Sequence, residues 1–112
     1  MPPDGARLAT SVLVSGLIRK AEVEGGFAAI LAKGDETAGS ILVILLERGG
    51  TPKALERILQ ADGGYGWQPS AEGESSVAEL VERRRRFDPD LWVVELDIPS
   101  AERFAAEMNA IN

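Results

Sequence analysis

The chain has 112 residues, of which 45% are hydrophobic and 27% are charged, as is typical of a globular fold with one core. It contains no cysteine and no histidine, which excludes disulfides, Ser-His and Cys-His catalytic pairs, and zinc sites built from thiolate or imidazole. The net charge of −6 arises within residues 61–112, and it repels nucleic acid and anionic lipid unless a local basic patch dominates.

We expect residues 1–112 to form a single small globular domain, with residues 1–6 as a flexible N-terminal tail. No apolar run approaches the roughly 20 residues that span a bilayer. No uninterrupted apolar segment follows a basic start, as it would in a secretory signal. We therefore expect the protein to reside in the cytoplasm and not to enter a membrane.

The first half of the chain predicts one helix followed by two strands. Thr10 or Ser11 can cap a helix whose apolar residues recur at helical spacing, and two adjacent glycines end it. Residues 27–32 predict a strand, and a polar loop over residues 33–39 follows. Residues 41–47 form a continuous branched run with both faces apolar, which predicts a central strand covered by helices on at least one side.

Residues 52–60 are ambiguous, because the preceding threonine and a proline can start a short helix, while the same run suits a strand. Two turn signals at hairpin spacing favour the strand, which would lead into a second strand over residues 65–68. A loop over residues 69–73 should follow.

Two helices and one strand complete the chain. Ser75 or Ser76 can cap a helix that runs to Arg86. Residues 91–98 predict a strand with its first four residues in the core, and residues 99–108 predict a final helix with one apolar face. The order α-β-β-β-β-α-β-α indicates an α+β fold, with an antiparallel sheet of four to five strands and about three helices packed on it.

Four consecutive arginines, residues 83–86, end the helix before the last strand. At about 100° per residue they point nearly all the way round the helix, so they cannot form one flat basic face. The apolar stripe of this helix, Val77, Leu80 and Val81, continues to positions 84 and 87. We therefore expect Arg84 to be half-sheltered and Phe87 to belong to the core.

Ion pairs should neutralise this helix end. Helical spacing predicts a pair from Glu79 to Arg83 and another from Glu82 to Arg86. Arg84 should pair with a nearby carboxylate, with three candidates in the residues that follow the helix, and Arg85 should be the most exposed of the four. The candidates are Asp88, Asp90 and Glu95. This arrangement is favoured over a nucleic-acid patch, which requires an uncompensated positive field.

The acidic turn Asp88-Pro89-Asp90 has two interpretations. Aspartate and proline build turns, so these carboxylates can simply be solvated. Alternatively, with Glu95 and Asp97 they faintly resemble a metal-dependent nuclease site, although Asp97 stands where such a site has a lysine. The solvated reading is favoured, and no metal, cofactor or catalytic residue is assigned. The residues proposed as a functional patch are Arg83, Arg84, Arg85, Arg86, Asp88, Asp90, Trp92 and Glu95.

The segment from Arg84 to Glu95, Arg-Arg-Arg-Phe-Asp-Pro-Asp-Leu-Trp-Val-Val-Glu, resembles the C-terminal signature of a small, chiefly alphaproteobacterial family of domains of unknown function. A helix ending in Arg19-Lys20, the motif Lys33-Gly34-Asp35-x-x-Ala38-Gly39, the stretch Leu55-Glu56-Arg57 and Trp67 are similar to that family too. The resemblance covers about residues 7 to 97. It implies a bacterial, soluble, stand-alone domain and carries over no catalytic residue and no cofactor.

Three classes of function remain open. The first is a non-enzymatic interaction domain that acts as a homo-oligomer or on another protein, because the residues for most chemistry are missing. The second is binding of nucleic acid or an acidic partner through the arginine run. The third is a carboxylate–metal enzyme built on the acidic turn and the last strand.

Overall fold

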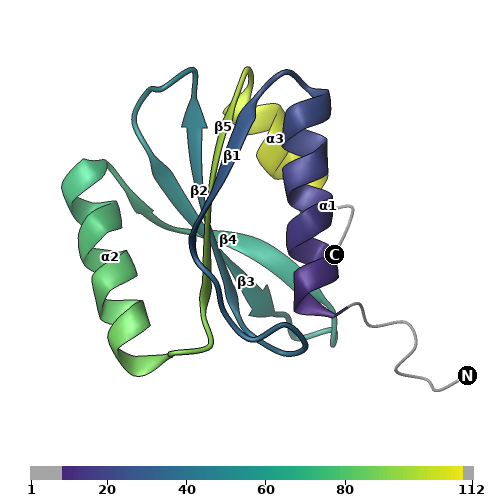
Figure 1. The fold of residues 1–112 in the computed structure, drawn as a ribbon, viewed down its shortest axis with the longest axis vertical. Helices are drawn as coiled ribbons and strands as arrows, with labels where there is room; N and C mark the ends of the chain where they lie inside the picture. Colours follow the sequence, from purple (N-terminus) through teal and green to yellow (C-terminus); the bar gives the residue numbers. More distant parts are fainter. Residues whose placement is uncertain (1–8, 110–112) are drawn as a thin grey trace, which may run out of the picture.

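The computed structural model describes residues 9–109, so the tail predicted over residues 1–6 lies outside the described residues. Three helices and five strands follow in the predicted order (Figure 1). They are α1 (Thr10–Val23), β1 (Phe27–Ala32), β2 (Ile41–Glu47), β3 (Lys53–Leu59), β4 (Tyr65–Glu72), α2 (Glu74–Phe87), β5 (Trp92–Ile98) and α3 (Ala101–Met108). The α+β class is confirmed, and the ambiguous residues 52–60 form a strand.

The five strands form one sheet in the order β1-β5-β2-β3-β4. β5 pairs antiparallel with β1 but parallel with β2, so the sheet is mixed where the sequence predicts an antiparallel one. The parallel pairing arises because β3, β4 and α2 alternate in direction, which returns the chain to the sheet in the direction of β2 (Figure 1). Local patterns do not show which earlier strand β5 will join.

β2 lies at the centre of the sheet with both faces covered, as its continuous apolar run predicts. Ile41, Val43 and Leu45 point to one face, and Leu42 and Ile44 point to the other. All five are at most 5% exposed. Burial on both faces explains why the run has no polar alternation.

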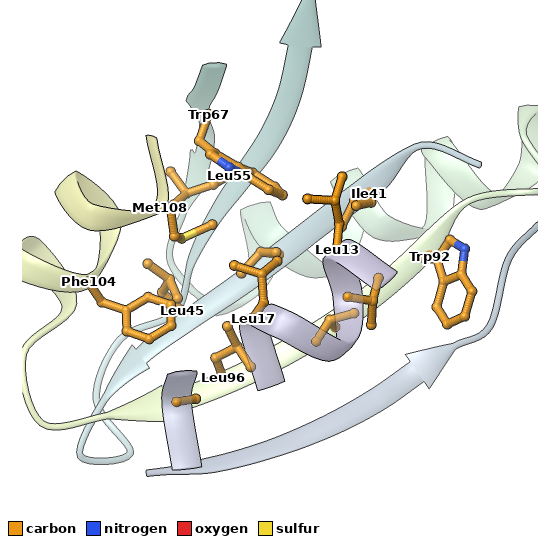
Figure 2. Close-up of a cluster of buried hydrophobic side chains, with 14 of the residues drawn as sticks. Leu13, Leu17, Ile41, Leu45, Leu55, Trp67, Trp92, Leu96, Phe104 and Met108 are labelled. Carbon is orange, nitrogen blue, oxygen red and sulfur yellow. The ribbon is translucent and has the colours of Figure 1, made fainter. Parts of the chain in front are cut away.

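The larger core cluster lies between the sheet and the helices α1 and α3, which cover the same face (Figures 1 and 2). Every strand except β1 contributes a buried side chain to it, and both helices contribute their apolar stripe. Its largest members are Leu13, Leu17, Ile41, Leu45, Leu55, Trp67, Trp92, Leu96, Phe104 and Met108. This face of the sheet is therefore closed.

The opposite face carries only α2, and its core cluster is smaller (Figure 1). Val77 and Leu80 of α2 are buried in this cluster and Val81 packs partly against it, as the stripe predicts. The sheet residues of the cluster are Leu42, Ile44, Ala54, Leu91 and Val93. One helix is too narrow to cover a sheet of five strands. The candidate site lies on the part of this face that α2 leaves uncovered.

The predicted helix caps are wrong at both α1 and α2. α1 begins at Thr10, whose hydroxyl donates to the carbonyl oxygen of Gly39 at 2.9 Å, and loop carbonyls accept the first backbone N–H groups of the helix. α2 begins after Gly73, with no side-chain cap, so Ser75 and Ser76 lie inside the helix. Contacts from a distant loop and a glycine turn decide where these helices begin.

β4 extends further than predicted, because residues 69–72 continue the strand instead of forming a loop. Pro69 fits there since β4 is an edge strand, and the pairing with β3 shifts register beside it. A proline is tolerated at an edge or a bulge, where its missing N–H is not required.

Candidate functional site

A groove of about 630 Å³ lies between α2 and the sheet. Its floor consists of apolar side chains from β1, β2 and α2, together with the turn between β2 and β3. These floor residues are Leu31, Ile44, Leu46, Pro52, Val77, Ala78 and Val81. The volume is in the range of sites that hold a small ligand or several side chains of a peptide. The groove exists because α2 leaves part of this face of the sheet uncovered.

Charged side chains surround the groove. Glu74, Glu82 and Glu95 supply three carboxylates, and Arg85 supplies one guanidinium. Glu95 reaches the groove from β5, where it pairs with Ala29 on one side and Ile44 on the other. The rim is therefore predominantly acidic. Arg85 and Glu95 are the two residues of the predicted functional patch that this groove brings together.

Arg84 is half-sheltered, as predicted, but its partner is not one of the predicted candidates. Its Nε lies 2.7 Å from Oε2 of Glu56 on β3, and Nη2 lies 3.3 Å from the other carboxylate oxygen. Asp88, Asp90 and Glu95 are thus wrong as partners. The sequence places Glu56 far away, and only the packing of α2 against β3 and β4 brings the two side chains together.

The Arg84–Glu56 pair shifts the protonation of both groups. Burial acts to raise the pKa of Glu56, but hydrogen bonds from Arg84 and the Ser70 hydroxyl outweigh it and hold the pKa below its ordinary value. The positive charge of Arg83 acts in the same direction. Glu56 is therefore charged and anchored, with 14% of its side chain exposed. This part of the arginine run serves the packing of α2.

The rest of the run agrees only in part with the predicted ion pairs. Nη2 of Arg86 lies 3.9 Å from Oε1 of Glu82, as the helical spacing predicts. Within residues 9–109 no ion pair joins Arg83 to Glu79. Phe87 is 78% exposed and does not belong to the core, because the helix ends at this residue and its buried stripe stops at Leu80.

Asp88 and Asp90 build the turn between α2 and β5. The Asp88 carboxylate accepts the backbone N–H of Asp90 at 3.1 Å, and the Asp88 carbonyl accepts the N–H of Leu91. Asp97 accepts the backbone N–H of Gly49 at 3.0 Å. Across the described part of the chain, no three acidic side chains gather as a metal site requires. The structure therefore offers no observation in favour of the nuclease-like interpretation.

Trp92 is a packing residue that ties β5 to the loop after β1. It is 3% exposed, and its indole N–H donates to the carbonyl oxygen of Asp35 at 2.7 Å. In return, the backbone N–H of Asp35 donates to the carbonyl oxygen of Asp90 at 3.0 Å. Two of the segments on which the family resemblance rests are thus bonded to each other, which indicates a structural role for them.

Glycines make this contact possible. A Cβ atom on Gly34 would lie 2.0 Å from the carbonyl oxygen of Asp90, and a Cβ atom on Gly39 would lie 2.3 Å from the same oxygen. No side chain fits at either position. The backbone of Asp90 packs directly on the loop, which in turn holds the start of α1.

The two edge strands of the sheet differ in their protection. β4 contains Pro69 and a glutamate, and the side-chain oxygen of Asn109 accepts the backbone N–H of Trp67 at 2.8 Å. β1, Phe-Ala-Ala-Ile-Leu-Ala, has neither a proline nor a charge. Its large side chains are exposed, with Phe27 at 76%, Ile30 at 47% and Leu31 at 50%. Charges and prolines on an edge prevent pairing with other chains, and β1 lacks them, its one irregularity being a register shift with β5 between Ile30 and Ala32.

The sequence does not predict the groove or the exposed edge. The apolar residues of β1 and of the α2 stripe resemble ordinary core positions, and nothing local shows that α2 covers only part of its face. The sequence of β1 contains one indication of an exposed edge, because the strand is short and uncharged and lies between two glycines and a lysine. No helix among the described residues is both long and apolar enough to cross a membrane.

The family model described as "Protein of unknown function (DUF1491)" matches residues 8–106. The crystal structure of a DUF1491 family protein from Caulobacter crescentus CB15 is 38% identical, covers 87% of this chain and 94% of that chain, and has a TM-score of 0.78. An NMR structure of a DUF1491 family protein from the same organism is also 38% identical, with 88% and 92% covered and a TM-score of 0.76. A solution structure from A. tumefaciens is 33% identical, with 88% and 92% covered and a TM-score of 0.74. No curated protein matches the sequence.

Proposed function

Since this chain belongs to the DUF1491 family of proteins of unknown function, we propose its function from the groove between α2 and the sheet. The protein is a non-enzymatic interaction domain, and the groove binds a short peptide segment of a partner. That segment presents apolar side chains flanked by lysine or arginine. The observation that carries the proposal is an apolar floor enclosed by a mainly acidic rim.

The floor supports apolar anchors in the ligand. Leu31 is half exposed, and Leu46 and Val81 are partly exposed, so all three apolar side chains present surface to the open groove. Exposed apolar surface in a concave site is typical of a binding groove, because a ligand that covers it removes it from water. A peptide docking beside a helix in this way buries alternate side chains.

The rim supports basic flanking residues. Three carboxylates against one guanidinium give the rim an excess of two negative charges. The whole chain is acidic as well, with a net charge of −6, so a basic segment is attracted at long range. Acidic peptides and nucleic acid are disfavoured by the same field. We further propose that the domain acts in the cytoplasm, as its lack of cysteine allows.

Selection from a library of random peptides displayed on phage tests the proposal. The wild-type chain should enrich peptides with apolar residues next to lysine or arginine. A fluorescein-labelled copy of an enriched peptide should then bind the wild-type chain, as measured by fluorescence polarisation. Ala78→Trp places an indole in the groove from an exposed helix position and should abolish binding. Ser75→Trp, on the same helix outside the groove, should bind normally.

A matched pair of charge reversals tests the rim. Glu82→Lys at the groove should weaken binding of the selected peptide about fivefold, since an exposed ion pair contributes up to about 1 kcal/mol. Glu79→Lys, on the same helix but away from the groove, should leave binding unchanged. The proposal fails if no peptide is enriched, or if Ala78→Trp binds the enriched peptide as tightly as the wild-type chain does.

A further inference from the structure

Independently of the groove, we infer that two copies of this chain associate through the free edge of β1. The two β1 strands pair antiparallel about a two-fold axis and join the sheets of the two copies into one continuous sheet. The occupant of the edge is therefore a second copy of the same chain. The inference rests on the free backbone, the exposed apolar side chains and the charge pattern of β1.

The backbone of β1 is paired on one side only. β5 pairs with it from Phe27 to Ile30 and again at Ala32, with a register shift at Leu31, and β1 is the last strand of the sheet on that side. Within residues 9–109, no backbone or side-chain hydrogen bond from outside the sheet reaches the free edge of β1. Its outward N–H and C=O groups are available to another strand, in the manner of strand addition.

Charge favours a second copy as the occupant. A two-fold axis brings a strand against its own copy, so a charge near the centre of the strand would lie close to a like charge. All six residues of β1 are uncharged. With the register centred on Ala29, Lys33 falls opposite Gly25 of the second copy, which keeps the two lysines apart. Two wild-type β1 strands can therefore pair without repulsion between like charges on the strands.

The alternation of side chains restricts the register. Opposite residues of an antiparallel pair point to the same face, so only registers that match equal faces are allowed. Phe27 and Ala29 pair with Asp97 and Glu95 and face α2, as does Leu31, which lines the groove. Ala28 packs on the opposite face, against the α1 side of the core.

The register centred on Ala29 satisfies this rule. It places Ala29 opposite its own copy at the axis, Phe27 opposite Leu31, and Ala28 opposite Ile30. The three exposed large side chains, Phe27, Ile30 and Leu31, each gain an apolar neighbour across the interface. Aromatic and branched cross-strand pairs of this kind stabilise sheets. Both grooves lie on the same face of the joined sheet, and Phe27 of each copy lies beside Leu31 at the edge of the other copy's groove.

Sedimentation of the full chain tests the association. The wild-type chain should sediment at twice the mass of one chain at submillimolar concentration. Ile30→Lys puts a charge on an exposed position of the edge and should give the mass of a single chain, with an unchanged circular dichroism spectrum. Ile58→Lys, at an exposed position of β3, is the matched control and should remain paired.

Cross-linking tests the register, since the chain has no cysteine of its own. Ala29→Cys should form an intermolecular disulfide under mild oxidation, because opposite residues across a strand pair lie about 4.5–5.5 Å apart between Cα atoms. Phe27→Cys should not, since its copy lies several residues away along the second strand. The matched edge control Gln68→Cys on β4 should not cross-link either.

Each outcome decides the inference. A wild-type chain that stays single at submillimolar concentration overturns it, as does a pair that survives Ile30→Lys. A pair in which Gln68→Cys cross-links and Ala29→Cys does not also overturn it. Peptide binding in the groove is measured separately, by comparing Ala78→Trp with the wild-type chain. Failure of the β1 pairing therefore does not contradict peptide binding, and failure of peptide binding does not contradict the pairing.

Discussion

At the scale of single residues, the arginine run separates into side chains with different surroundings. Arg84 is held by Glu56, Arg85 borders the groove, and Arg86 lies near Glu82. The helical spacing predicts that the four point in different directions, and these three side chains do so. The partner of Arg84 could not be predicted, because Glu56 reaches it through the packing of α2 and not through proximity in the chain.

Removing the Arg84 side chain should cost more stability than removing that of Arg85. Arg84→Ala leaves the largely buried Glu56 carboxylate without its cation, and we expect a loss of about 1 kcal/mol in the free energy of unfolding. Arg85→Ala removes an exposed side chain and should change the free energy of unfolding by less than about 0.5 kcal/mol. Urea denaturation at neutral pH measures both values. Equal losses would show that the Glu56 contact does not stabilise the fold.

The same pair should make stability depend on acidic pH. The pKa of Glu56 in the folded protein lies below its ordinary value of 4.5, so the folded state favours the charged carboxylate. This contribution is complete above the ordinary value and is lost as the pH falls below it, through the folded-state pKa. The wild-type chain should therefore lose stability more steeply below pH 4.5 than Glu56→Gln does. Thermal unfolding across this pH range measures the difference, with Glu79→Gln as a control that should follow the wild type.

At the scale of helices and strands, composition and periodicity predict most of what is seen. The continuous apolar run of β2 predicts a central strand, and the stripe of α2 predicts the side chains that pack on the sheet. The patterns do not predict that Phe87 projects into solvent or that β5 enters between β1 and β2. Pairing between distant strands depends on the whole set of packed elements, so local sequence does not specify it.

Two glycine-to-alanine substitutions should change stability in opposite directions. Gly39→Ala brings a Cβ atom to 2.3 Å from the carbonyl oxygen of Asp90 and should lower the free energy of unfolding by about 3 kcal/mol. Gly16 lies on the exposed side of α1, and a Cβ atom there would have no other atom within 4 Å. Gly16→Ala should therefore raise the free energy of unfolding by about 0.5–1 kcal/mol. Chemical denaturation of the two variants measures both changes. A mild effect of Gly39→Ala would mean that the loop and the turn can separate at little cost.

At the scale of the whole molecule, the helices divide unevenly between the two faces of the sheet. α1 and α3 close one face, and α2 covers part of the other (Figure 1). The groove and the exposed side chains of β1 both result from this uneven cover. Of the eight residues predicted as a functional patch, only Arg85 and Glu95 border the groove. The rest of the site comes from Glu74 and Glu82 at the rim and from the apolar floor residues, which sequence patterns assign to a core.

We propose that the single domain folds as one cooperative unit over residues 9–109. Both tryptophans lie in the core cluster on the α1 side, Trp67 on the edge strand β4 and Trp92 on β5, which lies beside the other edge strand. Tryptophan fluorescence and far-ultraviolet circular dichroism should therefore report one transition with the same midpoint in urea. Trp67→Phe, which leaves Trp92 as the reporter, should keep the two probes coincident. Separate midpoints would indicate that parts of the sheet unfold independently.

The position of β5 has a consequence for the newly made chain. β1 contacts the sheet through β5, and the parallel neighbour of β2 is also β5, yet β5 is the last strand to be synthesised. Until residue 98 has left the ribosome, β1 has no strand beside it and β2 has an open edge. The nascent chain therefore leaves one edge of its central apolar strand open from the synthesis of Glu47 to that of Ile98, a period in which an unpaired edge favours aggregation. The strand that completes the centre of the sheet is thus followed in the chain only by α3 among the described elements.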